Sequence, residues 1–263
     1  MTMKITVAKA DLETSLAIAS VGVAGSGNDL SSHYLFRIND GGKCEILTYN
    51  ARITVSVPLV ATIDEGEAGD AMTIEGWRLQ KWLSGVGDVS VTLENTSRGE
   101  VTASSPKSKV RLKALDPKKF PYWDKTLGEA KSITKINADR LAAALSYSRS
   151  FIYDADTTRP DISQVEVLKG HLWATDKRAV TLITMQGMDD SNLRIHGKDL
   201  PSVLKFLSNV GTEEVEVLEH DRSSFFKRKD GAVIGAARPL SQFPELNMDP
   251  NQGDQMFWEV AGE

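Results

Sequence analysis

The chain has 263 residues, of which 41% are hydrophobic and 25% charged, which is enough apolar mass for one large domain or two of ordinary size. Its net charge of −5 excludes a uniformly basic protein that coats itself with nucleic acid. A single basic face remains compatible with this total.

The first residues, "MTMKITVAKADLE", lack the basic and apolar segments of a secretion signal, and no apolar run approaches the ~20 residues that span a membrane. Cys44 is the only cysteine, so no intrachain disulfide can form, which is typical of a reducing compartment. We therefore expect a soluble, cytoplasmic protein with no membrane partner.

The first half of the chain mixes strand and helix patterns. Helical spacing predicts helices over 10–20 and 77–86, the first with Asp11 in its opening turn. The segment "DGGK" at 40–43 is a hairpin signal. Alternating apolar residues predict strands over 4–8, 34–38, 43–49, 51–60, 72–76, 89–94, 101–106 and 110–115.

The second half shows the same order of patterns. Helices are predicted over 138–148 and 198–210, the first again with an aspartate, Asp139, in its opening turn. The segment "KGH" at 169–171 is a second hairpin signal. Strands are predicted over 132–136, 163–170, 171–175, 179–185, 193–197, 214–220, 223–229 and 232–237.

Four blocks of the first half match the second half in the same order, which indicates a duplication. Residues 4–20 align with 132–148 at a shift of 128 (132 − 4). The other pairs are 47–57 with 173–183, 73–83 with 194–204, and Phe120-Pro121 with Phe243-Pro244. We predict an α+β fold of two tandem repeats, each with two helices packed on antiparallel sheet. The boundaries that follow are a first domain at 1–124, a linker at 125–131, a second domain at 132–249 and a tail at 250–263.

No catalytic or metal-binding pattern stands out in the sequence. The four histidines are not spaced as metal ligands, and neither a phosphate-binding loop motif nor a nucleophile elbow occurs. Asp154 with Asp156, and Asp189 with Asp190, resemble the carboxylate pairs of two-metal sites, but solvated loops give the same pattern. We expect no enzyme, no metal and no cofactor; an enzyme that uses these aspartates is one alternative.

Three segments carry a resemblance to a known family. "RPDISQVEVLKGHLWATDKRAVTLITM" (159–185) resembles the part of bacterial DNA polymerase sliding clamps that contains A-T-D-G-H-R-L. Ala174-Thr175-Asp176 and Arg178 match that run, and Lys177 stands where the family has two residues. "VRLKALDPKKFPYWD" (110–124) resembles the clamp segment that ends in D-F-P, and "TIEGWRLQKWLSGV" (73–86) resembles the second clamp helix.

The resemblance implies the DNA clamp fold and the function of a processivity factor. Such a clamp encircles duplex DNA without sequence preference, tethers a DNA polymerase and is placed on DNA by a clamp loader. Bacterial β clamps carry three domains per chain and form dimers. Two domains per chain, as in the PCNA-like clamps of archaea, eukaryotes and some bacteriophages, imply a homotrimeric ring. The alternative within this fold is an interaction module that binds replication proteins without encircling DNA.

A clamp contacts DNA through helices that line the ring, so the basic helix residues are the candidates. Arg78 and Lys81 lie at i, i+3 and therefore share a helix face. The full set is Lys9, Arg78, Lys81, Arg140, Arg149, Lys198 and Lys205. The alternative is that these residues form ordinary solvated helix faces.

Clamps also bind partners through a hydrophobic pocket that takes a short peptide, and two locations remain open. The bacterial precedent points to the hairpin with Thr175, Asp176, Lys177 and Arg178. The two-domain precedent points to the interdomain connector and the first hairpin, with Tyr49, Arg52, Tyr122 and Trp123. Asp176 and Arg178 are equally compatible with a charged hairpin tip or a structural ion pair.

Two apolar groups need a separate interpretation. We read Trp77, Leu79, Trp82 and Leu83 on the second helix as packing residues, and not as platforms on which bases stack. Met256-Phe257-Trp258 in the acidic tail is either a docking peptide or a final packing strand.

Overall fold

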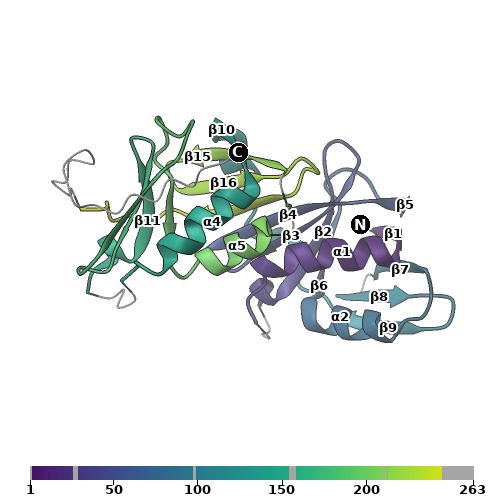
Figure 1. The fold of residues 1–263 in the computed structure, drawn as a ribbon. Coiled ribbons are helices and arrows are strands. Elements are labelled where there is room, and N and C mark those ends of the chain that lie inside the picture. The colour runs from purple at the N-terminus through teal and green to yellow at the C-terminus, as the bar shows by residue number, and fades with distance from the viewer. Residues whose placement is uncertain are drawn as a thin grey trace. The chain divides into compact units, whose positions relative to one another are not determined.

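The computed structural model describes residues 2–25, 29–96, 99–153, 158–208, 210–211 and 213–244, and the side chain of residue 96 is excluded. The chain divides into two compact units. The first contains Met1–Trp123 and Asp230–Ile234, and the second contains Asp124–Lys229 and Gly235–Glu263. Figure 1 shows α1 and α2 among the purple and blue segments and α4 and α5 among the teal and green ones.

The first half of the chain forms two antiparallel sheets, in the orders β5-β1-β7-β8-β9 and β4-β3-β2-β6. Its two helices are α1 (Lys9–Ala19) and α2 (Gly76–Gly85). Its strands are β1 (Lys4–Ala8), β2 (His33–Ile38), β3 (Cys44–Tyr49), β4 (Ile53–Leu59), β5 (Ala61–Glu65), β6 (Ala71–Glu75), β7 (Ser90–Thr96), β8 (Glu100–Ser104) and β9 (Lys109–Lys113). Three-residue helical turns lie at Ser20–Gly22, Leu30–Ser32 and Pro117–Lys119.

The second half repeats these pairings, with the orders β10-β15-β16-β17 and β13-β12-β11-β14. Its helices are α3 (Asp124–Glu129), α4 (Ala138–Arg149) and α5 (Leu200–Leu207), with a helical turn at Pro160–Ile162. Its strands are β10 (Lys131–Asn137), β11 (Gln164–Leu168), β12 (His171–Thr175), β13 (Val180–Thr184), β14 (Arg194–His196), β15 (Glu214–His220), β16 (Ser223–Lys227) and β17 (Val233–Ala237).

The predicted α+β class and the repeated element order are confirmed, with two local differences. Strand β5 was not predicted, and the strand predicted over 51–60 extends one residue beyond the end of β4 at Leu59. The predicted linker at 125–131 forms most of α3 and the first residue of β10. The tail at 250–263, with Met256-Phe257-Trp258, lies outside the described residues.

The buried stripes of α1 and α4 correct the predicted alignment by one residue. Helix α1 buries Leu12, Ser15, Leu16 and Ala19, and α4 buries Leu141, Ala144, Leu145 and Ser148. These two stripes match at a shift of 129 (141 − 12), not 128. Identical residues such as Asp11 and Asp139 favoured the wrong register, because a match of exposed side chains carries no packing constraint.

Both hairpin signals form tight turns for the expected reason. Lys169 and Gly170, which join β11 to β12, have φ of 51° and 75°. Two successive positive φ values match the twist of the flanking strands. Gly42, between β2 and β3, has φ of 68°.

Gly76 begins α2 where a side chain has no room. A Cβ atom there would lie 3.0 Å from Cε2 of Tyr34 and 3.2 Å from the carbonyl oxygen of Ser32. Its repeat partner Gly197 is similarly crowded, with Cγ2 of Ile152 at 3.0 Å from the added carbon. The same close approach in both copies explains why each carries glycine at this step from strand to helix.

We therefore expect Gly76→Ala to lower the free energy of unfolding by about 1–3 kcal/mol, because the buried Tyr34 ring must shift. The matched control is Gly85→Ala at the other end of α2, where an added Cβ meets nothing within 4 Å. Its expected effect is a gain of about 0.4–1 kcal/mol, because alanine restricts the unfolded chain. Urea unfolding measures both, and equal effects of the two changes would contradict the steric argument.

Among the described residues, no helix is both long and apolar enough to cross a membrane.

Candidate functional site

The four longer helices carry the opposite charge to the rest of the chain. Helices α1, α2, α4 and α5 contain six basic and three acidic residues, a net charge of +3 (6 − 3). Since the whole chain carries −5, the remainder carries −8 (−5 − 3). Six of the seven basic residues predicted for DNA contact lie on these helices, and Lys198 lies just before α5.

In the second unit, two of the predicted cations converge. Helices α4 and α5 pack against each other, as Figure 1 shows. Arg149 at the end of α4 and Lys198 just before α5 line one shallow hollow, together with Ile152, Gly197 and Pro201. Arg140 and Lys205 are also exposed on these helices. Two cations lining one hollow can bind a phosphate group without reading a base.

In the first unit, α2 is basic and α1 is not. Arg78 and Lys81 are both exposed on α2. Lys9 on α1 is engaged locally, because its Nζ donates to the Val86 carbonyl at 2.7 Å and lies 3.5 Å from Glu13. The exposed face of α1 also carries Asp11 and Glu13, so this helix contributes little attraction to phosphate.

The predicted packing role holds for only part of the second helix. Leu79 and Leu83 are buried. The indole N–H of the half-buried Trp82 donates to Oγ of Ser108 at 2.9 Å. Trp77 is 46% exposed, so it does not pack in the core of this chain. The helix turns this position away from the sheet, which the apolar character of the residue does not reveal.

The hairpin between β12 and β13 is a structured turn. Thr175 is buried and donates from Oγ1 to the Ala179 carbonyl at 2.7 Å. Oδ1 of Asp176 accepts the backbone N–H groups of Arg178 at 2.9 Å and Ala179 at 2.8 Å. These backbone hydrogen bonds hold the pKa of the Asp176 carboxyl below its usual value. Thr175 and Asp176 therefore shape the turn, and Lys177 and Arg178 form its exposed tip.

Lys177 at this tip also fixes a neighbouring aromatic ring. Its backbone has φ of 79°, and its Nζ lies 4.0 Å from the ring centroid of Tyr153. A hydrogen bond with Lys177 lowers the pKa of Tyr153. The tip is thus predominantly charged.

The connector candidates separate into buried and exposed groups. Trp123 is buried, and Tyr49 packs against a small cluster of Leu35, Leu47 and Phe120. Arg52 is half-buried, and its backbone N–H donates to Oδ1 of Asn50 at 3.2 Å. Of the four connector candidates, only Tyr122 is largely exposed, at 43%.

Tyr122 is held rigidly in this exposed position. Its hydroxyl donates to the Pro117 carbonyl at 3.1 Å, and its ring meets the Phe120 ring edge-on at 5.7 Å. The guanidinium of Arg37 lies 5.4 Å from the ring centroid and is itself paired with Glu45 at 2.7 Å. A rigid, half-exposed tyrosine above an apolar cluster is well suited to anchor a partner peptide.

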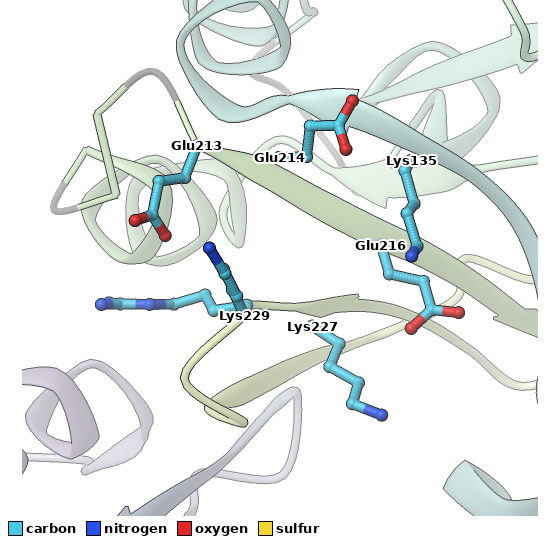
Figure 2. Close-up of a pocket in the computed structure, with 7 residues that line it drawn as sticks. Lys135, Glu213, Glu214, Glu216, Lys227 and Lys229 are labelled. Atoms are coloured by element: carbon cyan, nitrogen blue, oxygen red, sulfur yellow. The ribbon is translucent and has the colours of Figure 1, made fainter.

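A mixed-charge pocket was missed by sequence reasoning. Figure 2 shows it over β10, β15 and β16. Its lining residues are Lys135, Glu213, Glu214, Glu216, Lys227, Arg228 and Lys229. Lys135, Glu216 and Lys227 face one another across three strands, in alternating charge. Only the strand register brings them together, and their opposite charges make the pocket a poor phosphate site.

The alternative of a carboxylate metal site gains no support from the described residues. In that part of the chain, no three His, Cys, Asp or Glu side chains are grouped as metal ligands. Asp189 and Asp190 lie exposed in a turn. Asp154 and Asp156 lie outside the described residues.

No protein-family model matches the chain, and no curated protein matches it in sequence. Solved structures match over 93% of the chain. They include the DNA polymerase sliding clamp of Bacillus subtilis, with 18% identity and a TM-score of 0.80. Another is the sliding clamp of Bartonella birtlesii bound to griselimycin, with 18% identity and a TM-score of 0.79.

The β subunit of DNA polymerase III from Thermotoga maritima matches 92% of the chain, with 18% identity and a TM-score of 0.73. This chain spans about two thirds of the length of these clamps, 67%, 67% and 66% respectively. The predicted fold is thereby confirmed. The protein has the α+β DNA clamp fold of the bacterial DNA polymerase β sliding clamps.

Proposed function

We propose that the protein is a DNA polymerase processivity factor, a sliding clamp that encircles duplex DNA as a homotrimer. The observation that supports this proposal best is the charge of +3 on the four helices of a clamp fold whose remaining residues carry −8. The clamp acts by topology and carries out no chemistry, so it needs neither a metal nor a cofactor. It works where DNA is replicated, in the cytoplasm of a bacterium or of a phage-infected cell.

The helices contact the phosphate backbone and therefore bind any sequence. Exposed lysine and arginine side chains make salt-screened contacts, and such contacts are weak enough to exchange while the ring slides. The acidic remainder of the chain repels DNA and so discourages binding to any other face. The seven basic residues named from the sequence remain the proposed contacts, with Lys9 the weakest because its ammonium group is engaged by Glu13 and Val86.

The ring would close through the ends of the sheets. Strand β9 lies at one end of a sheet in the first half, and β13 lies at one end of a sheet in the second half. The end of a sheet offers backbone hydrogen-bonding groups to another chain. A head-to-tail contact that pairs β9 of one copy with β13 of the next generates a closed ring when the rotation per copy fits.

We expect three copies per ring, because two clamp domains per chain supply six domains in a trimer. Light scattering on the eluting peak should give about 86 kDa at micromolar concentration, three times the chain mass of 28.8 kDa. A strict monomer under these conditions would contradict the ring and would favour an interaction module that binds replication proteins without encircling DNA.

The partners that follow are a replicative DNA polymerase and a clamp loader. We propose that the polymerase binds the rigid surface around Tyr122, because this surface combines an exposed aromatic ring with an apolar cluster beneath it. The hairpin with Thr175, Asp176, Lys177 and Arg178 is the competing location, and its exposed tip is charged.

A further inference from the structure

The first turn of α2 presents an aromatic ring and a guanidinium group that share one anchor. The indole N–H of Trp77 donates to Oε1 of Glu75, and Nε of Arg78 lies 2.9 Å from Oε2 of the same carboxylate. The Glu75 side chain is only 9% exposed, whereas that of Arg78 is 52% exposed. One shielded carboxylate therefore orients two exposed side chains.

The two side chains also contact each other and extend to a third. The guanidinium carbon of Arg78 lies 5.2 Å from the centroid of the Trp77 ring. Lys81 is four residues from Trp77 and three from Arg78, so all three lie on one face of the helix. Gln80 fixes the rotation of the helix, because its Nε2 donates to the hydroxyl of the buried Tyr34 at 2.7 Å.

From this arrangement we propose that Trp77, Arg78 and Lys81, which we call the tryptophan face, bind unpaired nucleotides of single-stranded DNA. The indole stacks on an exposed base, and the two cations hold the adjoining phosphates. Glu75 is a positioning residue that keeps the ring and the guanidinium in place.

The chemistry of the face favours nucleic acid over a protein partner. Helix α2 contains two cations and no acidic residue, and its other exposed side chains, Gln80 and Ser84, are polar. An apolar peptide would find only one ring to bury, whereas a polyanion gains both charges. Aromatic rings alternating with cations are the usual platform for single strands, because every base has a face that can stack.

The same face discriminates against intact duplex. In a duplex the base faces are stacked on one another, so the indole has no base to stack on. Phosphates remain available to Arg78 and Lys81 in either form of DNA. Trp77 should therefore contribute to the binding of single strands, gaps and primer ends, and contribute little to the binding of continuous duplex.

The repeat shows that this feature belongs to the first half alone. At the shift of 121 that aligns Gly76 with Gly197 (197 − 76), Trp77 corresponds to Lys198 and Arg78 to the buried Asp199. The second half has a cation where the first has the indole. Each chain would thus carry one tryptophan face, on one of the helices proposed to contact duplex.

The test measures fluorescence anisotropy with a labelled oligothymidylate of roughly 20 nucleotides and with a duplex of equal length. Trp77→Ala should weaken oligothymidylate binding about tenfold, as expected for loss of one stacked base, and change duplex binding less than twofold. Trp77→Phe keeps an aromatic ring and should retain most of the affinity. The matched control is Tyr147→Ala on α4, where the tyrosine is 42% exposed, and both affinities should stay unchanged.

Two results would overturn the proposal: unchanged oligothymidylate binding by Trp77→Ala, or equal losses for single strand and duplex. The Phe variant keeps an aromatic ring at this half-exposed position. It therefore tests the proposal even if alanine perturbs the helix. The inference rests on the proposed function only in that a processivity factor meets DNA during replication. Short oligonucleotides have open ends, so this assay reports on the tryptophan face even if the protein forms no ring.

Discussion

Arg149→Glu combined with Lys198→Glu should weaken duplex binding and flatten its dependence on salt. Both side chains line one hollow beside α4 and α5, so the change converts a phosphate-attracting site into a repelling one. Each lost phosphate contact should reduce the slope of log K against log [salt] by about 0.9, or by about 1.8 for the pair. In a trimer the double change occurs three times, so the loss of DNA retention should be larger than in a single chain.

The control for this experiment reverses the same amount of charge elsewhere. Lys43 and Lys107 are exposed in loops of the first half, outside the helices. Lys43→Glu with Lys107→Glu changes the net charge equally and should leave the salt slope unchanged. Arg78→Glu with Lys81→Glu provides the same test on α2. If the helix and loop variants behave alike, binding follows net charge and the helix contacts are wrong.

Tyr122→Ala should reduce the affinity for the cognate replicative polymerase about 30-fold, the size expected for an aromatic anchor at an interface. The ring is held by Pro117, Phe120 and Arg37 before any partner binds, so little ordering cost offsets the contact. Surface plasmon resonance with immobilised polymerase measures the effect.

Arg178→Ala is the matched comparison for the partner site, because Arg178 is exposed at the tip of the competing hairpin. We expect the affinity of this variant for the polymerase to stay within about twofold of that of the unchanged protein, since exposed charges at an interface rim contribute little. A large loss with Arg178→Ala and none with Tyr122→Ala would move the pocket to the hairpin.

The fold was predictable from the sequence because strands and helices leave periodic patterns that the duplication shows twice. Alternation marked β4, whose Ile53, Val55 and Val57 all point into the core. The patterns failed where an apolar residue is not buried. Val60 is apolar but 79% exposed between β4 and β5, so its apolar character extended the predicted strand one residue beyond the end of β4.

The sequence predicted the helices of the candidate site, but not which side chains are buried or which lie close together. The sequence pattern placed Arg149 just beyond one predicted helix and Lys198 at the start of another, yet only the packing of α4 on α5 brings them to one hollow. Sequence alone also gives no sign that Trp123 is buried, because its neighbours Tyr122 and Asp124 are polar or exposed. Tertiary contacts decide such burial, and they join residues far apart in the chain.

The central claim, that the protein encircles DNA, is tested most directly by comparing a nicked circular plasmid with the same plasmid cut once. The protein is loaded with its clamp loader and ATP and then passed through a sizing column at a salt concentration that screens the helix contacts. The account predicts that it co-elutes with the circle and is lost from the linear form, because a ring slides off free ends. Equal retention on both forms, or loss from both, would contradict a topological link.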